Sequence, residues 1–351
     1  MASPWHCETL TSSQAELGHE VTVLGPQPWF GPGLDQRIRQ LDWTRLRPLD
    51  SRLALDMGLL RRVVKRGTET GDAYDIVHLH SSRAGLVGRL ADLRAPVVFQ
   101  PHGWSFHPLQ GRWRQAAMSL ERRLASRSRG VLYCSEAERR VGLDAGIDPE
   151  HQLVALNAPS VPRLALPVPE SHRIAARRAL ELPEEAPVYG FVGRITDAKA
   201  PDRLWRAWAA VRRRNAGAQL LVMGEGLVPA LPGLRHLGLV DDVGAHLDAC
   251  DALVLLSRWE GMPLAILDAM ARGVPVVASR EAIDPEDLGE AGTVVDGDSP
   301  AAVADALLAR RVGTAQWWQE ALAGLDLAAD RYDPGRLAGR VCDFYRQVVP
   351  V

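Results

Sequence analysis

DALVLLSRWEGMPLAILDAMARGVPVVAS, residues 251–279, carries the sequence pattern of one complete α/β unit. Short apolar runs at 252–256 and 274–278 predict two buried strands, and the apolar segment between them predicts a helix. Pro263 suits the first helical position, where a missing N–H costs nothing, and Gly273 suits the left-handed position that ends a helix. The chain is therefore expected to contain a parallel sheet covered by helices.

The loop before the predicted helix carries Glu260 and Gly261. The first N–H groups of a helix have no intrahelical acceptor and, together with the helix dipole, attract anions such as phosphate. A carboxylate can accept paired hydrogen bonds from neighbouring hydroxyl groups of a sugar. Phosphate beside a polyol suggests a sugar nucleotide as the ligand. The alternative interpretation is that Glu260 lies near the helix start because negative charge is favourable there.

The same stretch resembles the signature of retaining GT-B glycosyltransferases of family 4, in which a Glu, seven residues and a second Glu lie in a phrase like EGxPLxxLEAMAxGxPVVA. This chain has Glu260, seven residues and then Asp268, so the second acid is shorter by one methylene. The resemblance implies two Rossmann-like α/β domains with parallel sheets facing a cleft. It also implies a hexosyl-type enzyme that transfers a sugar from a nucleotide diphosphate sugar to a hydroxyl with retention of configuration.

Length and composition agree with a globular protein of about two domains, since the chain has 351 residues, of which 46% are hydrophobic and 24% charged. A formal net charge of −2 gives no overall electrostatic footprint for nucleic acid. The four cysteines lie far apart without a C-x-x-C motif, which argues against a zinc site or a disulfide framework. No apolar run is long enough to span a bilayer, and the start lacks a signal-peptide pattern. A cytoplasmic location is expected, with peripheral contact at the inner face of the cell membrane as an option.

The proline-rich segment that follows the predicted strand near Val154 is the best candidate for an interdomain linker, because its prolines exclude helix. We expect an N-terminal acceptor-side domain over 1–158, a linker with a following helix over 159–187, and a C-terminal domain for the nucleotide sugar over 188–333. By resemblance, the helical pattern of 334–351 crosses back to the first domain.

The first residues resemble a family passage that normally comes after an opening strand and a glycine-rich turn. Residues 8–17 predict a helix, Gly18 its cap and 20–24 a strand. We therefore expect either that the recorded start is late or that this member has lost the first strand.

Two predicted strands in the first half of the chain, over 75–80 and 96–99, place histidines near their ends. Ligands of parallel α/β sheets bind at the carboxyl ends of the strands. In the resembling family a His-Gly pair at the position of His102 and Gly103 lies against the donor sugar. His102 is therefore the catalytic candidate of this domain, and His102 and Gly103 are the acceptor-side candidates. The other nearby histidines are interpreted as structural: His78, His80 and His107.

Residues 111–130 contain six arginines among apolar residues and predict a basic amphipathic helix. Such helices can lie on anionic membrane surfaces. A packed helix with a solvated basic face is the other interpretation.

A predicted strand over 188–192 ends at Gly193, and the loop that follows presents Arg194 and Lys199 with four residues between them. Two permanent cations near the carboxyl end of a strand suit a diphosphate, since Arg can fork across two oxygens and Lys adds a compact charge. The resembling family holds the pyrophosphate of its donor with a matching Gly-Arg, four residues and Lys. The other interpretation of a lone Arg/Lys pair is solvated surface, and the diphosphate interpretation gains support because the order and separation of this motif and of Glu260 fit one fold.

Two further motifs are not interpreted as ligand sites. Gly224 and Gly226 form a G-x-G, but the third glycine of a dinucleotide fingerprint and its downstream acid are absent. Asp296-Gly297-Asp298 followed by Ser-Pro is typical of a turn that leads into a helix. We expect no catalytic metal, and no cofactor apart from the nucleotide diphosphate sugar as co-substrate.

The predicted donor site consists of Gly193, Arg194, Lys199, Glu260, Gly261, Met262, Pro263, Leu264 and Asp268. By resemblance, Arg194 and Lys199 would neutralise the departing diphosphate. Glu260 would orient the donor sugar and Asp268 would hold the ribose. The backbone amides of 261–264 would assist in binding phosphate.

The predicted function is a metal-independent glycosyltransferase of polysaccharide, glycolipid or natural-product glycoside biosynthesis. Its partners would be a nucleotide sugar donor and a saccharide, lipid-linked saccharide or small-molecule acceptor, and not nucleic acid. Two alternatives stay open. One is a nucleotide-sugar 2-epimerase on the same scaffold, and the other is a non-catalytic partner subunit that binds a nucleotide sugar.

Overall fold

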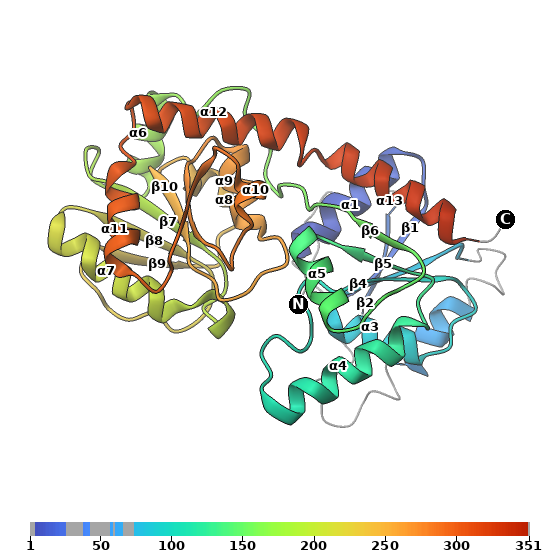
Figure 1. The fold of residues 1–351 in the computed structure, drawn as a ribbon. Helices are drawn as coiled ribbons and strands as arrows, with labels where there is room; N and C mark the ends of the chain where they lie inside the picture. The colour runs from blue at the N-terminus through green and yellow to red at the C-terminus, as the bar shows by residue number, and fades with distance from the viewer. Residues whose placement is uncertain (1–3, 26–37, 43–56, 59, 66–73, 350–351) are drawn as a thin grey trace. The chain divides into compact units, whose positions relative to one another are not determined.

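The computed structural model describes residues 4–25, 38–42, 57–58, 60–65 and 74–349 (Figure 1). The chain folds into two compact units: unit 1 comprises residues 1–157 and 334–351, and unit 2 comprises residues 158–333. Both units alternate strands and helices, and every strand pairing among the described residues is parallel. The predicted α/β class with parallel sheets is therefore confirmed.

Unit 1 contains two parallel sheets among its described residues. Strands β1 (Val21–Gly25) and β2 (Ile38–Asp42) pair with each other. The second sheet has the order β3-β4-β5-β6 and consists of β3 (Val77–His80), β4 (Val97–Gln100), β5 (Gly130–Tyr133) and β6 (Gln152–Val154). β4 and β5 are buried along their whole length, as short apolar runs within a parallel sheet should be. None of the described strands pairs with both β1 and β3, so the two sheets stay separate.

Helices cover the strands of unit 1. They are α1 (Pro4–Glu16), α3 (Ser81–Leu90), α4 (Gly111–Ala125), α5 (Glu136–Asp144) and α13 (Pro334–Val348). α13 packs on α1 (Figure 1) and lies so close to β5 that a Cβ on Gly130 would come within 2.6 Å of Phe344 Cζ. The C-terminal helix is therefore an integral part of unit 1.

Unit 2 is built on one sheet of six parallel strands, in the order β12-β11-β10-β7-β8-β9. The strands are β7 (Val188–Val192), β8 (Gln219–Met223), β9 (Leu234–Gly238), β10 (Ala252–Leu255), β11 (Val276–Ser279) and β12 (Gly292–Val295). From β7 the chain adds β8 and β9 on one side, and then returns to place β10 on the other side of β7. Ligands of such sheets bind where the strand order reverses, beyond the carboxyl ends of the strands. In unit 2 this place lies between the loops that follow β7 and β10.

The helices of unit 2 complete the alternation. They are α6 (Glu170–Ala179), the 3-10 turn η1 (Asp197–Lys199), α7 (Pro201–Arg214), α8 (Val243–Leu247), α9 (Leu264–Ala271), α10 (Pro285–Leu288), α11 (Pro300–Ala309) and α12 (Ala315–Asp330). The segment expected to be a linker is docked on unit 2 near its start, because Leu164 N–H donates to Ala271 O at 2.9 Å. Its helix α6 is held by Arg177, whose buried guanidinium donates to Asp251 Oδ1 at 2.7 Å.

The stretch 251–279 folds as predicted, with small shifts at the boundaries. Strand β10, helix α9 and strand β11 follow one another, but the helix begins at Leu264 and Pro263 is its extended N-cap residue. Gly273 has a φ of +65°, and the bond from Val274 N–H to Ala269 O closes the helix end. The expected glycine cap is therefore present, whereas the expected helical role of Pro263 is wrong by one position.

Candidate functional site

Lys199 and Glu260 meet at the place in unit 2 where the strand order reverses. Lys199 ends the turn after β7, and Glu260 lies in the loop after β10. The Lys199 Nζ atom is 2.7 Å from Glu260 Oε1, and the two side chains are 18% and 16% exposed. Ser257 Oγ also donates to Glu260 Oε1, at 2.7 Å. Two motifs that lie 61 positions apart in the sequence thus form one half-buried, charged site.

The backbone around Lys199 is held in an unusual conformation. Ala200 has a φ of +48° although it is not a glycine, and its side chain is fully buried. Pro201 follows it, and a proline disfavours the right-handed helical region for the residue before it. Left-handed non-glycine residues cost about 1–3 kcal/mol and tend to occur at functional sites. The strain at Ala200 therefore agrees with a site at Lys199.

Arg258 connects the two loops, which the sequence analysis did not anticipate. Its N–H donates to Ala198 O at 2.8 Å, and its guanidinium donates to Asp197 O at 3.0 Å. The same guanidinium donates to Asp202 Oδ1 at 2.7 Å. Burial acts to raise the pKa of the Asp202 carboxyl, but the bond and the charge of Arg258 outweigh it and lower that pKa. An arginine two residues before a candidate acid is the only sequence signal of this role. Arg258 thereby joins the loop that carries Glu260 to the turn that ends at Lys199.

The G-x-G of Gly224 and Gly226 serves the site through packing. A Cβ on Gly224 would lie 2.1 Å from Gly193 O, and one on Gly226 would lie 2.5 Å from the Ile195 Cβ. A Cβ on Gly193 would in turn lie 2.9 Å from Lys199 Cε. Only glycines allow the loops after β7 and β8 to approach this closely. The G-x-G therefore allows the loop after β8 to pack against the loop that leads to Lys199.

The remaining predicted donor residues are distributed around this pair. Arg194 is exposed and makes no ion pair with the described residues. Gly261 is half-buried, Met262 and Pro263 are buried, and Leu264 is half-buried at the first position of α9. The first N–H groups of that helix have no intrahelical acceptor, and the helix begins four residues after Glu260.

Asp268 is buried and bonded within unit 2. Its side chain is 3% exposed, and its Oδ1 and Oδ2 accept hydrogen bonds from Ser160 N–H at 2.6 Å and from Ser160 Oγ at 2.8 Å. Both oxygens are thus occupied by the segment that enters unit 2. In this structure Asp268 anchors the segment at Ser160, and its role toward a ribose stays a prediction.

Replacing Asp268 by asparagine is expected to stabilise the protein above pH 6. Burial raises the pKa of this carboxyl from 3.8 to about 6, and the bonds from Ser160 act in the opposite direction. A folded-state pKa above the unfolded value gives stability that is present below pH 4 and is lost as the pH rises through about 6. The new amide side chain of the Asp268→Asn variant keeps an acceptor for Ser160 N–H and cannot ionise.

Urea denaturation at pH 5 and pH 8 measures this effect. The free energy of unfolding of Asp268→Asn should exceed that of wild type by up to about 3 kcal/mol at pH 8, and the difference should shrink at pH 5. A variant that is less stable than wild type at pH 8 would show that the carboxylate is a net stabilising group.

In unit 1, His102 stands at the carboxyl end of β4 in a left-handed conformation. Its φ is +52°, and the following Gly103 has a φ of +93°. His102 Nε2 lies 2.9 Å from His80 Nδ1, with the two rings stacked at 5.2 Å between centroids. His80 ends β3, which is the neighbouring strand. The structure thus brings His80 to His102, although the sequence analysis interpreted His80 as structural.

The other two histidines have other surroundings. His78 Nδ1 lies 2.7 Å from Tyr345 Oη of α13. His107 stacks on Phe106 at 5.7 Å between centroids, and burial together with Arg114 lowers its pKa. Both interactions fit the structural interpretation.

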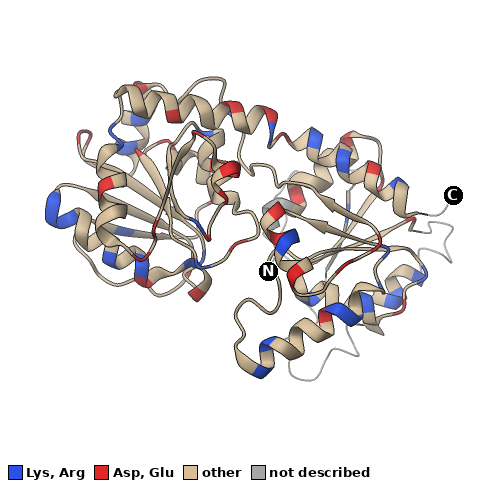
Figure 2. Ribbon diagram, viewed as in Figure 1, with Lys and Arg blue, Asp and Glu red and all other residues tan. Residues whose placement is uncertain are grey.

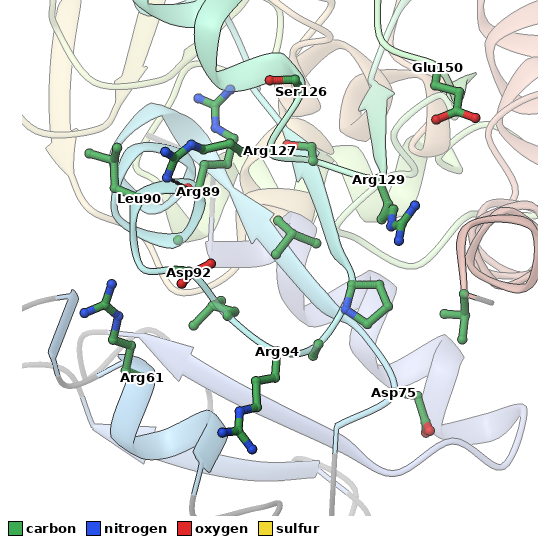
Figure 3. A pocket seen from close by; sticks show the side chains of 17 residues that line it. Arg61, Asp75, Arg89, Leu90, Asp92, Arg94, Ser126, Arg127, Arg129 and Glu150 are labelled. Carbon is green, nitrogen blue, oxygen red and sulfur yellow. Dashed lines mark hydrogen bonds between the residues drawn. The ribbon is translucent and has the colours of Figure 1, made fainter.

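A hollow of about 920 Å³ lies near the amino ends of the strands in the β3–β6 sheet (Figure 3). Part of its lining comes from residues that precede the strands, including Asp75 before β3, Pro96 before β4, Arg129 before β5 and Glu150 before β6. His102 lies at the carboxyl end of the same sheet. The hollow is therefore not part of the candidate site.

The chain matches two protein-family models and several named relatives. The family model described as Glycosyl transferases group 1 matches residues 186–310, and the model described as Glycosyl transferase 4-like domain matches residues 4–158. A D-inositol 3-phosphate glycosyltransferase of Actinosynnema mirum is 34% identical over 308 residues, which cover 77% of this chain and 71% of that protein. A GDP-mannose-dependent alpha-(1-6)-phosphatidylinositol monomannoside mannosyltransferase of Mycobacterium tuberculosis is 27% identical and covers 93% of this chain and 90% of its own.

Solved structures share the fold at lower identity. Sucrose-phosphate synthase from Thermosynechococcus elongatus matches with a TM-score of 0.78 at 17% identity, over 98% of this chain and 92% of that one. Anabaena Alr3699/HepE in complex with UDP-glucose matches with a TM-score of 0.78 at 19% identity, over 99% and 97% of the two chains.

Two α/β units with parallel sheets, together with these neighbours, define the GT-B class of fold. The chain belongs to the glycosyltransferase family described as Glycosyl transferases group 1. It is a transferase that acts on glycosyl groups.

Proposed function

We propose that this glycosyltransferase takes a sugar from a nucleotide diphosphate sugar and transfers it to an acceptor hydroxyl with retention of configuration. The observation that supports this proposal is the Lys199–Glu260 pair at the switch point of the unit 2 sheet. A cation and a carboxylate side by side suit the two chemical parts of such a donor. The ammonium attracts the diphosphate, and the carboxylate accepts hydrogen bonds from sugar hydroxyls.

Lys199 and Arg194 act on the diphosphate in this proposal. Negative charge builds up on the diphosphate as its bond to the sugar breaks, and a preorganised cation stabilises the transition state at that point. The N–H groups at the start of α9 add partial positive charge. Glu260 orients the sugar, while Asp268 acts indirectly by anchoring the segment at Ser160. The proposal includes no metal, and a transfer rate unchanged by a chelator is its expected consequence.

The reaction would proceed on one face of the sugar. The bond between the anomeric carbon and the diphosphate oxygen breaks, the acceptor oxygen bonds to the same face, and the departing phosphate oxygen takes the acceptor proton. The acceptor binds to unit 1, at the strand ends that carry His102 and Gly103. A covalent glycosyl-enzyme trapped on any side chain would contradict this course.

The named relatives support the substrate class. One bears the name of a D-inositol 3-phosphate glycosyltransferase, one is called GDP-mannose-dependent, and one solved neighbour is in complex with UDP-glucose. Another relative is called a UDP-Gal:alpha-D-GlcNAc-diphosphoundecaprenol alpha-1,3-galactosyltransferase, a name that contains a sugar joined to a lipid diphosphate. We infer a hydroxylated acceptor of the polyol, saccharide or lipid-linked saccharide class, as used in polysaccharide or glycolipid assembly.

A matrix of donors and acceptors tests the function. UDP-glucose, UDP-galactose and GDP-mannose are each incubated with inositol phosphate, a free disaccharide or a lipid-linked saccharide, and products are detected by mass spectrometry. The anomeric coupling constant of the product, measured by proton NMR, should equal that of the donor. Epimerised nucleotide sugar without an acceptor would favour a 2-epimerase instead, and binding of a donor without any product would favour a non-catalytic subunit.

We also propose peripheral contact between α4 and an anionic membrane. Trp113 is 63% exposed and Leu120 42% exposed, while Arg112 and Arg123 are exposed on the same helix. Figure 2 shows basic residues along this helix. Exposed apolar side chains among cations suit a surface of anionic lipid headgroups. Among the described helices none is long and apolar enough to cross a membrane.

Vesicle flotation measures this contact. The protein should float with vesicles that contain phosphatidylglycerol and not with pure phosphatidylcholine, and replacement of Arg112 and Arg123 by glutamate should abolish flotation. Arg213→Glu, on the exposed side of α7 in unit 2, is the matched control. Equal flotation of the double variant and wild type would refute the role of α4.

A further inference from the structure

Glu138 is a buried carboxylate that connects three segments of unit 1. Its side chain is 3% exposed on the first turn of α5. Oε1 accepts the Gly103 N–H at 2.5 Å, and Oε2 accepts the Cys134 N–H at 2.9 Å. Cys134 Sγ adds a third contact, at 3.1 Å from Oε2. One carboxylate therefore joins the turn after β4 to the residue after β5.

The same residue also holds the turn through its backbone. Trp104 Nε1 donates to Glu138 O at 2.9 Å, and Ser135 Oγ accepts the Glu138 N–H at 3.1 Å. Helix α5 lies so close to the indole that a Cβ on Gly142 would come within 2.6 Å of Trp104 Cζ2. Glu138 thus holds the turn 102–104 twice: its side chain accepts from Gly103 N–H, and its backbone carbonyl accepts from Trp104 Nε1.

The turn needs this support because of its conformation. His102 and Gly103 have consecutive positive φ values of +52° and +93°. A left-handed non-glycine residue persists only where its surroundings over-determine it. The bond from Gly103 N–H to Glu138 fixes the peptide unit that directly follows His102. Without it, the turn loses one of the contacts that oppose relaxation of His102.

We propose that Glu138 is a positioning residue, which sets the place of the His102 imidazole by holding the next peptide N–H. This inference rests on the proposed function, in which His102 lies at the acceptor side of the reaction. Glu138 touches no substrate. It acts on the reaction only through His102.

The Glu138→Gln variant tests the carboxylate with almost no change in volume. Both carboxylate oxygens face N–H donors, so whichever way the amide turns, its NH₂ group meets one of those donors. One of the two bonds is lost. We expect kcat to fall by about 10–100-fold, the cost of a misplaced group near the reacting atoms, while the dissociation constant of the donor stays the same.

A double-mutant cycle with His102→Ala separates positioning from general destabilisation. If Glu138 acts through His102, Glu138→Gln lowers kcat strongly in wild type and has almost no further effect in the His102→Ala background. An equal fold-loss in both backgrounds would overturn the inference.

Glu320→Gln is the matched control, since Glu320 is a buried carboxylate of unit 2 that is bonded to Arg310 at 2.8 Å. It should lower the melting temperature and leave kcat unchanged.

Amide hydrogen exchange tests the same inference without any substrate. Exchange at Gly103 should be slow in wild type and at least 10-fold faster in Glu138→Gln. Glu138→Asp gives a second test, because it keeps the charge but is too short to bond both Cys134 and Gly103. Unchanged exchange at Gly103 in both variants would overturn the positioning role. A wild type that transfers no sugar while Gly103 exchange responds as expected would refute the proposed function and leave the positioning contact established.

Discussion

Lys199→Ala is expected to reduce sugar transfer by about 10²–10³-fold, the range observed when one preorganised donor to a developing negative charge is removed. Two effects act together. The diphosphate loses the ammonium that neutralises it, and Glu260, 2.7 Å away in the wild type, keeps its charge without a counterion. The remaining carboxylate then repels the donor. Nucleotide diphosphate affinity and kcat should therefore fall together.

Steady-state kinetics with the donor identified in the matrix measure this loss. Lys65→Ala is the matched control, because Lys65 is the chain's other lysine and lies exposed in unit 1. Circular dichroism and the melting temperature should show that both variants are folded. Transfer by Lys199→Ala at the wild-type rate would mean that the diphosphate lies elsewhere.

Glu260→Gln is expected to separate the sugar from the diphosphate. The amide can still accept from Ser257 Oγ, but it no longer neutralises Lys199. Lys199 is then more available to a phosphate, so the affinity for the nucleotide diphosphate without sugar should be kept or should rise. Transfer should fall by about 10²-fold, because the sugar loses its charged hydrogen-bond acceptor.

Calorimetric titration with the nucleotide diphosphate and kinetics with the complete donor measure the two effects. The two variants should differ most in their affinity for the nucleotide diphosphate. Lys199→Ala should lose this affinity, and Glu260→Gln should retain it. Glu225→Gln, an exposed acid in the loop after β8, is the control. Parallel loss of nucleotide diphosphate affinity in both variants would contradict separate roles for Lys199 and Glu260.

The fold could be predicted from the sequence because its signals are local. Short apolar runs give the buried strands, and Gly273 gives the end of α9 at the predicted place. The position of Pro263 was predicted wrongly because proline is acceptable both before and at the first helical position. The separation of the β1-β2 pair from the β3–β6 sheet could not be predicted, because periodicity along one strand does not show which strands pair with each other.

The site was predictable where the family motif contains it, and less so elsewhere. Lys199 and Glu260 meet as the motif implies. The apolar residues all around α9 indicate a buried helix, which agrees with the 3% exposure of Asp268. Its partner Ser160 lies 108 positions away, and no local pattern announces such a bond.

Glu138 shows the same division between local and distant contacts. Ser135 and Glu138 have the S-x-x-E spacing of a capping box, so a role at the start of a helix could have been predicted. In the structure the carboxylate bonds to Cys134 N–H and to Gly103, which is 35 positions away. The second bond depends on how β4 and β5 are placed, and only the folded sheet reveals it.

The most direct test of the central claim is the binding of a panel of nucleotide sugars, measured by thermal shift for wild type, Lys199→Ala and Lys65→Ala. A donor present at a hundred times its dissociation constant should stabilise wild type by about 2.7 kcal/mol. The account predicts that at least one nucleotide sugar gives this shift with wild type and Lys65→Ala, and that Lys199→Ala loses it. A shift that survives in Lys199→Ala, or the absence of any shift with wild type, would contradict the account.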